Sequence, residues 1–462
     1  MALDKGREIR ADLTEGTVFR QLLLFSLPIV ATNTLQAAYN IVDMAVVGRY
    51  LGNISLSAVS VGSDIIHMLT LVSNGLSSAA QIIISQHIGA KKKDAVSKSA
   101  GTILSAGILF AAVLTILMFV FNDVILDAIN TPEEAWMDAV SYTVTSYFGL
   151  IFIIGYGILS SLLRGIGDSR HPLMFIIVTS VTNIILDCLF VIKMNMGTCG
   201  AALATVTAQG VSFVWALIFI YKNRQQFDFE INMGIFHIDK KILLDYIKLA
   251  IPMSLQRTLV QGANLYINSY IYAYGVIAVA VTGIGNKLGT ICQIFTNGFL
   301  QGGAAMIGQN IGAGKMKRVK TIVYINLLYS LVVGIFFTAV TVLYREEIFR
   351  VFTIDKLVLD MSNVYLLALI LKYFMFCVRC PFMALINGIG KPVLNYLLGI
   401  FDGLILRVGS ALVLGIVLDM GLQGFWYGNA VGGFAPLLIG GVYFFSGSWK
   451  KDALAKFERI EG

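Results

Sequence analysis

The chain has 462 residues, of which 57% are hydrophobic and 13% are charged. A water-soluble domain of that composition would expose an almost entirely apolar surface, so the composition excludes one and indicates a membrane protein. The net charge of +7 does not indicate a nucleic-acid partner, because the Lys and Arg residues lie at alternate ends of apolar segments and form no single basic stripe.

Twelve apolar segments follow one another along the chain, and each is long enough to cross a bilayer as a helix. An isolated strand would leave its backbone groups unpaired in lipid, and the alternating pattern of a closed barrel is absent. We therefore predict an all-α polytopic membrane protein. Its transmembrane helices are expected at residues 22–47, 54–85, 99–121, 139–163, 172–192, 199–221, 248–273, 276–307, 321–343, 361–387, 393–418 and 421–446.

The first predicted helix carries a polar face. Asn33, Gln36, Asn40 and Asp43 follow one another at spacings of three and four residues, so they lie on one side of the helix. A carboxylate at the centre of a membrane helix costs on the order of 2.5–3.5 kcal/mol. We therefore expect this face to avoid lipid, and Asp43 to have a function or a buried partner.

The fifth and sixth helices supply further polar groups at a similar depth. Asn183 and Asp187 are four residues apart and share a face, and Thr205 can add a hydroxyl. Asp43 and Asp187 each precede by six residues the basic residue that marks the outer end of the helix, which puts both carboxylates roughly 9 Å below the outer surface. These oxygens suit Na⁺, or a desolvated carboxylate pair that holds a proton, although packing of neighbouring helices would also use them.

The second half of the chain has different polar residues. Arg257, Gln261, Asn264 and Asn268 form a stripe on the seventh helix, where substrate contact and helix-to-helix bonding are equally good interpretations. The position that matches Asp43 is occupied by isoleucine or asparagine, depending on the register, so no acid is repeated there. Coupling chemistry is therefore expected in the first half.

The partners of the charged residues in the other spans are predicted less directly. Arg407 matches Asp187 when the register is counted from the proline at the start of each helix. Asp402 and Arg407 are five residues apart, about 140° around an α-helix, so we expect them to have separate partners. Asp64 matches Lys287 across the two halves and is expected to join an interlobe or structural ion pair.

The cysteines do not indicate a cofactor. All five lie in or beside apolar spans, which gives no disulfide framework. Cys377 and Cys380 form a C-x-x-C, but no further ligands accompany them, so a packing role is expected. We therefore predict neither a cofactor nor a metal held by cysteine.

The connections between the spans indicate the topology. Most of the 34 Lys and Arg residues collect on one side when both termini and the even-to-odd connections are placed there. By the positive-inside rule that side is the cytoplasm, and the acidic loop at residues 123–138 is external. The charged N-terminal segment lacks the apolar core of a signal peptide. We expect a multi-pass protein of the cell membrane, inner or plasma, with cytoplasmic termini.

Short sequence words recur in the same order about 224 residues apart, which indicates an internal duplication. Pro28 is echoed by Pro252, and the Gly-Ile-Gly word at residues 165–167 is echoed at 388–390. Two pseudo-symmetric lobes of six helices are therefore expected. The predicted parts are a cytoplasmic tail at 1–20, an N-lobe at 21–222, a cytoplasmic linker at 223–245, a C-lobe at 246–446 and a cytoplasmic tail at 447–462.

Several motifs occur together in one order. They are the SLP at the start of the first helix, the stretch from Tyr39 to Asp43, Gln-x-Ile-Gly-Ala after the second and eighth helices, Arg-Gly-x-Gly-Asp after the fourth, and Asn183-x-x-x-Asp187 in the fifth. In these motifs nearly the whole chain resembles the multidrug and toxic compound extrusion (MATE) exporters, in particular the bacterial branch related to DinF.

This resemblance implies a transporter and not an enzyme. It implies twelve helices in two lobes and export of amphipathic, often cationic, small organic compounds in exchange for inward H⁺ or Na⁺, by a protein that acts as a monomer in a bacterial membrane. It places the cation site, and Na⁺ if that is the ion, on Asp43, Asn183, Asp187 and Thr205. The residues expected to line the substrate cavity are Gln36, Asn40, Arg257, Gln261, Asn264, Asn268 and Arg407.

Two other functions are alternatives to transport of drugs. An intramembrane aspartyl protease is suggested by the GxGD word at residues 165–168, but the second copy of that word ends in lysine and no Tyr-Asp partner motif occurs. A flippase for a lipid-linked or polyanionic substrate would share the architecture and would need a strongly cationic cavity. Cations in the second half keep this alternative open: Arg257, Lys287, Arg379 and Arg407.

Overall fold

The computed structural model describes residues 11–227 and 238–461 of the chain. Helices make up most of these residues, and no strand occurs among them. The predicted all-helical, polytopic fold is confirmed. The predicted linker at 223–245 lies partly outside the described residues, as does the tail at 1–20.

Packing divides the chain into two units, one of residues 1–12 and 31–250 and the other of residues 13–30 and 251–462. Two of the three boundaries fall inside long helices, close to Pro28 in α1 and Pro252 in α8, and the third follows residue 12, before α1 begins. A proline inside a helix removes one backbone hydrogen bond and crowds the preceding turn. The two boundaries inside helices therefore fall where the helix is locally weakened.

The first unit is a bundle in which α2 packs on α5, and α6 and α4 pack on α7. The break between α4 and α5 bends one predicted span by 44° at Gly149, whose close contact with Val206 leaves no room for a side chain. The helices of this unit are α1 (Val18–Tyr50, from residue 31), α2 (Gly52–Gly89), α3 (Lys93–Ala128), α4 (Trp136–Phe148), α5 (Leu150–Ile166), α6 (Arg170–Asp187) and α7 (Gly197–Lys222), with a 3₁₀ turn at Glu133–Ala135 and a π-helical segment at Cys188–Lys193.

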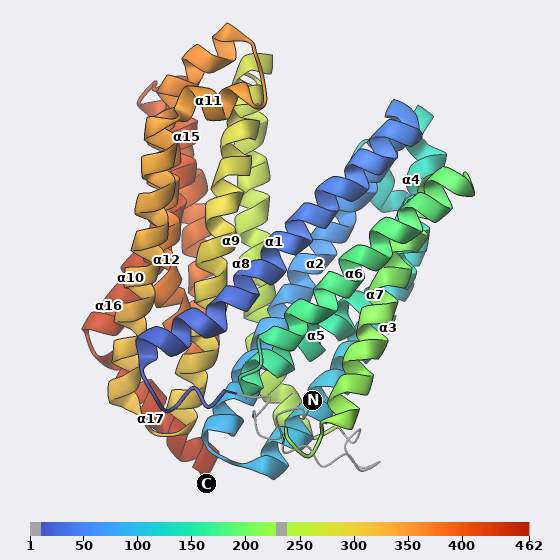
Figure 1. The fold of residues 1–462 in the computed structure, drawn as a ribbon. Coiled ribbons are helices and arrows are strands. Elements are labelled where there is room, and N and C mark those ends of the chain that lie inside the picture. Colours follow the sequence, from blue (N-terminus) through green and yellow to red (C-terminus); the bar gives the residue numbers. More distant parts are fainter. Residues whose placement is uncertain (1–10, 228–237, 462) are drawn as a thin grey trace, which may run out of the picture. The chain divides into compact units, whose positions relative to one another are not determined.

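In the second unit α9, α10 and α12 run side by side (Figure 1). The α-helices of this unit are α8 (Lys240–Tyr272, from residue 251), α9 (Val276–Gly312), α10 (Met316–Leu343), α11 (Arg345–Arg350), α12 (Lys356–Ile389), α13 (Pro392–Gly399), α14 (Ser410–Leu412), α15 (Gly421–Val431), α16 (Gly441–Phe445) and α17 (Ser448–Glu461). Three π-helical segments interrupt its last two spans, at Ile400–Gly409, Val413–Val417 and Pro436–Gly440, with a 3₁₀ turn at Gly432–Phe434.

Within the described residues, ten helices are by themselves long and apolar enough to span a membrane, and the bent pair of α4 and α5 makes an eleventh. The helix α8, with 33 residues, occupies the place of the seventh predicted span. Its polar stripe explains why it is not among the ten, since charged and amide side chains lower the hydropathy of that segment.

The segment from Leu13 to the start of α1 packs within the second unit. The Leu13 N–H donates to Gln309 Oε1 at 3.2 Å, Asn310 donates to the Leu13 carbonyl at 3.0 Å, and Lys315 Nζ donates to the Thr14 carbonyl at 2.9 Å. The predicted boundary at residue 21 and the observed division at residue 30 therefore differ. Long-range hydrogen bonds of this kind leave no periodic signal in the sequence.

Candidate functional site

Two carboxylates of the first unit lie together. Asp43 is on α1, and Asp187 is the last residue of α6, directly before the π-helical segment at Cys188–Lys193. Asp187 is completely buried and Asp43 is half-buried. The two side chains are close enough to interact directly. The equal depth expected from the sequence thus corresponds to a pair of neighbouring acids.

Asn183 and Thr205 lie beside this pair. Asn183 is one turn before Asp187 and is 1% exposed, and its Nδ2 donates to Thr205 Oγ1 of α7 at 3.2 Å. The structure thus brings together the four residues expected to hold a cation: Asp43, Asn183, Asp187 and Thr205.

The oxygens of this cluster lack donors. Asp43 Oδ1, Asn183 Oδ1 and both carboxylate oxygens of Asp187 are buried, and none accepts a hydrogen bond from the part of the chain that the structure describes. Burying an acceptor without a partner costs about 1–3 kcal/mol, and more when the group is charged. A set of acceptors with no donor is suited to a proton or to a hard cation such as Na⁺, which prefers oxygen ligands.

Two tyrosines complete the surroundings of the carboxylates. Tyr142 of α4 is 6% exposed, its hydroxyl lies 3.2 Å from Ser63 Oγ, and its side chain interacts electrostatically with both Asp43 and Asp187. Tyr39 of α1 is also buried and interacts with Asp43. The sequence predictions missed Tyr142, because an uncharged residue in an apolar span gives no signal.

The two cavity candidates on α1 are placed differently. Gln36 is half-buried and lies beside Tyr39, with which it interacts, whereas Asn40 is exposed. Asp64, on α2, is also exposed. It forms no ion pair with any residue in the described ranges, so the structural ion pair expected for it is not observed there.

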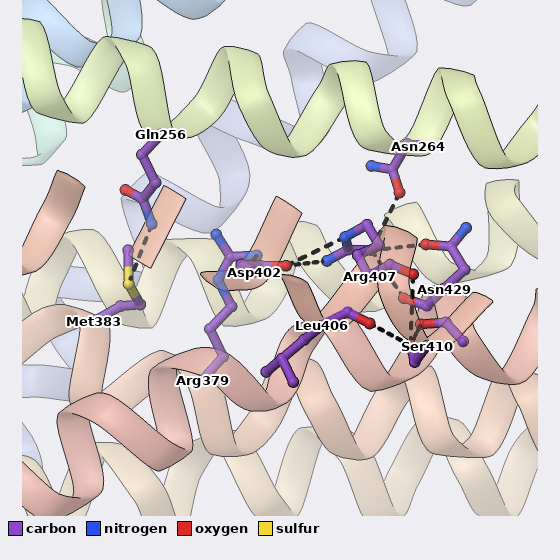
Figure 2. A network of polar contacts seen from close by, with 10 residues as sticks. Gln256, Asn264, Arg379, Met383, Asp402, Leu406, Arg407, Ser410 and Asn429 are labelled. Atoms are coloured by element: carbon purple, nitrogen blue, oxygen red, sulfur yellow. Dashed lines mark hydrogen bonds and ion pairs between the residues drawn. The ribbon is translucent and has the colours of Figure 1, made fainter. Parts of the chain in front are cut away.

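A second polar cluster lies inside the second unit (Figure 2). Arg407 donates to Asp402 Oδ1 through Nη2 at 2.6 Å and through Nε at 3.2 Å. The expectation that these two residues have separate partners is wrong. It assumed an α-helix, whereas Ile400–Gly409 is π-helical, and its i to i+5 hydrogen bonds align residues five apart.

The remaining donors of Arg407 are also used. Nη1 lies 3.1 Å from Asn264 Oδ1 on α8 and 2.7 Å and 2.9 Å from the side-chain and backbone oxygens of Asn429 on α15 (Figure 2). Nη1 of Arg379, on α12, lies 3.8 Å from Oδ2, the other carboxylate oxygen of Asp402. Asn264 therefore links α8 to the π-helical segment that carries Arg407.

The other members of the α8 stripe are Arg257, Gln261 and Asn268, and all three are half-buried. The Asn268 Oδ1 atom is buried and accepts no hydrogen bond from a described residue. Of the seven predicted cavity residues, Asn264 and Arg407 thus meet each other, and Gln36 lies beside Tyr39, which interacts with Asp43.

A family model named MatE matches the chain twice, over residues 28–189 and 252–413. The matched residues amount to more than half of the chain. It belongs to the MatE family. The double match agrees with the duplication inferred from the repeated words, and it assigns one copy of the repeat to each half of this MATE protein.

Individual relatives agree with this membership. The probable multidrug resistance protein YoeA of Bacillus subtilis is 26% identical over 449 residues, 96% of each chain. YpnP, a probable multidrug resistance protein of the same organism, is 32% identical over 312 residues, 67% of this chain and 68% of YpnP. A crystal structure of a MATE protein in complex with MaD3S shares the fold, with a TM-score of 0.86 at 22% identity, over 98% of this chain and 100% of that chain.

The predicted MATE resemblance is confirmed, and the chain is a multi-pass membrane transporter and not an enzyme. The intramembrane protease alternative therefore falls away. The Gly167 turn of the GxGD word has a structural explanation, because its φ of +109° is a conformation that favours glycine and a Cβ atom there would lie 2.2 Å from the Ala11 carbonyl oxygen.

Proposed function

We propose that this MATE transporter exports amphipathic organic compounds, including cationic ones, in exchange for H⁺ or Na⁺ bound at Asp43, Asn183, Asp187 and Thr205. The relatives support the direction and the kind of cargo, since YoeA and YpnP are both described as probable multidrug resistance proteins. Transporters of the family are ion-coupled. We further propose that the chain acts as a monomer in a bacterial cell membrane, with both termini in the cytoplasm.

One observation carries this proposal, namely the four buried oxygens of Asp43, Asn183 and Asp187 that accept no hydrogen bond from a described residue. Two buried carboxylates in contact repel each other unless a cation or a proton lies between them. An empty pair therefore has a high free energy, and an ion entering it lowers that energy. An ion that binds this pair more tightly in one conformation of the protein shifts the population toward that conformation.

Inside-out membrane vesicles test the proposal. Vesicles whose lumen is acidic, or in a separate experiment loaded with Na⁺, should accumulate a fluorescent organic cation such as ethidium. The variant Asp43→Asn should lose gradient-driven uptake, because it removes one of the two carboxylates. A suitable control is Asp64→Asn, which removes an acid of the same unit that is exposed and lies outside the cluster.

Each outcome decides a part of the proposal. Uptake driven by one gradient alone identifies the coupling ion. Uptake that ignores both gradients in the parent protein would contradict antiport. Undiminished gradient-driven uptake by Asp43→Asn would contradict the assignment of the site, and a loss in Asp64→Asn equal to that in Asp43→Asn would do the same.

A further inference from the structure

The second unit holds more positive than negative charge inside its apolar spans. Asp402 is the only acid in the spans predicted for the second half, whereas six cations lie within them: Lys248, Arg257, Lys287, Lys372, Arg379 and Arg407. Asp402 is completely buried, and Arg407 is 8% exposed. An excess of positive charge in a low-dielectric interior is costly, and an anion bound there would lower that cost.

Arg407 does not require an additional anion. Its Nε and Nη2 atoms bond to Asp402, and Nη1 bonds to Asn264 and Asn429. The pair of Asp402 and Arg407 is therefore close to neutral, and the donors of Arg407 are satisfied by Asp402 and by two asparagines of neighbouring helices, while Asp402 Oδ2 accepts no hydrogen bond from a described residue. The single negative charge of Asp402 is already matched before Arg379 is considered.

Arg379 is in a different situation. Its nearest approach to an acid is 3.8 Å, from Nη1 to Asp402 Oδ2, which is beyond hydrogen-bond distance. It donates no hydrogen bond to any residue in the described part of the chain, and its side chain is 20% exposed. A guanidinium carries five N–H donors in a planar fork that fits a carboxylate or a phosphate. Arg379 is thus both unsatisfied and accessible.

A second cation lies on the neighbouring helix α8. Arg257 is half-buried, and Gln256, the residue before it, donates to Sδ of Met383, one turn beyond Arg379 on α12, at 3.7 Å (Figure 2). Two glycines bring the span that carries Asp402 close to α8, since a Cβ atom at Gly399 would lie 2.9 Å from the Gln256 backbone and one at Gly403 would lie 3.1 Å from the Leu259 carbonyl. The π-helical segment therefore packs directly against the turn of α8 that carries Arg257.

Lys372 extends the positive region along α12. It is two turns before Arg379 and so lies on the same side of the helix. Its Nζ atom donates to Asn286 Oδ1 at 2.7 Å, and the ammonium has further donors. A neutral amide oxygen satisfies one of these donors without neutralising the charge. The three cations thus follow one face of α12 and the adjacent turn of α8.

From this arrangement we infer that Arg379 and Arg257 bind the anionic group, a carboxylate or a phosphate, of an amphiphile. The bidentate face of Arg379 holds the anion, and Arg257 adds charge from α8. An amphiphile fits because the site lies within apolar spans, where its hydrocarbon part has favourable surroundings. That this amphiphile is also cargo rests on the proposed function and would add anionic or zwitterionic compounds to the exported class.

Equilibrium binding to the purified full-length protein in phosphatidylcholine nanodiscs tests this site. Two probes share one ring system and differ in charge, namely pyrenebutanoate and pyrenebutanol, with binding to empty nanodiscs subtracted. The parent protein should bind the acid about tenfold more tightly than the alcohol, a difference of about 1.4 kcal/mol. Equal binding of the two probes would overturn the inference.

Substitutions of single cations show which residues cause the preference for the acid over the alcohol. Arg379→Gln should bind the two probes alike, Arg379→Lys should keep part of the preference, and Arg257→Gln should lose a smaller part. The matched control is Lys287→Gln, which removes one cation from an exposed position of α9 and should keep the preference. A full preference for the acid in Arg379→Gln would overturn the inference. If that variant is not monodisperse, a full preference in Arg257→Gln decides in the same way.

A further arm identifies the source of the anion. Phosphatidylglycerol in the nanodiscs should weaken pyrenebutanoate binding severalfold if a lipid headgroup is the natural occupant, and should leave it unchanged if the site selects a soluble amphiphile. Binding is measured without an ion gradient, so it does not depend on coupling. A failure of Asp43→Asn to abolish coupling would contradict the proposed antiport while this measurement would still stand.

Discussion

The two units carry opposite charges at matching positions of the repeat. Asp187 in the first unit and Arg407 in the second occupy the same place after the proline that begins the helix, and each is buried. The oxygens of Asp187 accept no hydrogen bond from the described chain, whereas Arg407 is bonded to an acid and two asparagines. On the proposed mechanism, one copy of the scaffold leaves its charge open to an exchangeable ion, whereas the other neutralises its charge within the protein.

Breaking the pair in the second unit should have the largest effect on stability. Arg407→Leu leaves Asp402 buried without its partner, which should cost about 3–5 kcal/mol of the free energy of unfolding. Thermal unfolding of the detergent-purified protein measures this loss. The double variant Asp402→Leu with Arg407→Leu should recover much of it, because no buried carboxylate is then left without Arg407. A single variant as stable as the parent would contradict the structural role of this pair.

The corresponding substitution in the first unit should abolish transport and leave the stability nearly unchanged. Asp187→Asn removes a charge whose oxygens have no donor to lose, so the free energy of unfolding should change by less than about 1 kcal/mol or should rise. Gradient-driven uptake should nevertheless disappear. A strongly destabilised Asp187→Asn would show that the acid is a structural partner, and the contrast between the units would then fail.

Removing a neutral ligand should have a smaller effect than removing a carboxylate. Thr205→Val keeps the shape of the side chain but deletes the hydroxyl that accepts from Asn183. The concentration of the coupling ion that gives half-maximal uptake should rise severalfold, because the loss of one hydrogen bond costs about 1 kcal/mol. Thr205→Ser retains the hydroxyl and should behave as the parent. Equal affinities in Thr205→Val and the parent would remove Thr205 from the site.

The smallest effect is expected outside the apolar spans, at the C-terminal helix α17. Burial opposes ionisation of Asp452, but hydrogen bonds from Lys391 at 2.5 Å and Tyr443 at 2.7 Å hold its pKa below the ordinary value of 3.8. Because the pKa is depressed in the folded protein, the stabilisation is present above pH 4 and is lost as the pH falls through the folded-state value.

Lys391→Met should therefore lower the melting temperature slightly at neutral pH, since an ion pair this exposed contributes up to about 1 kcal/mol. The difference from the parent protein should shrink as the pH falls below about 4. A difference that is unchanged by acid would mean that Lys391 acts through packing and not through Asp452.

Regular helices account for what the sequence could predict. The rise per residue places Asp43 and Asp187 at one depth, and the spacing of four places Asn183 beside Asp187, so the members of the first cluster follow from counting residues. The π-helical segment at Ile400–Gly409 breaks this regularity. Its altered turn aligns Asp402 with Arg407, and nothing in the residue spacing indicates that change.

Two other features depend on distant parts of the chain. Tyr142 reaches the carboxylates because α4 packs against Gly62 of α2, where a Cβ atom would lie 2.4 Å from the tyrosine ring. The packing of residues 13–30 within the second unit depends on hydrogen bonds such as that between Leu13 and Gln309, 296 residues away. Such contacts follow from the fold and not from local propensity.

Ion flux triggered by the cargo is the most direct test of the central claim, that coupling belongs to the carboxylate pair of the first unit. Proteoliposomes of the parent protein should show H⁺ or Na⁺ flux when ethidium is added to one side, and Asp187→Asn should still bind ethidium but show no flux. Asp64→Asn should keep the flux. Flux that persists in Asp187→Asn, or that is lost in Asp64→Asn as completely as in Asp187→Asn, would contradict the claim.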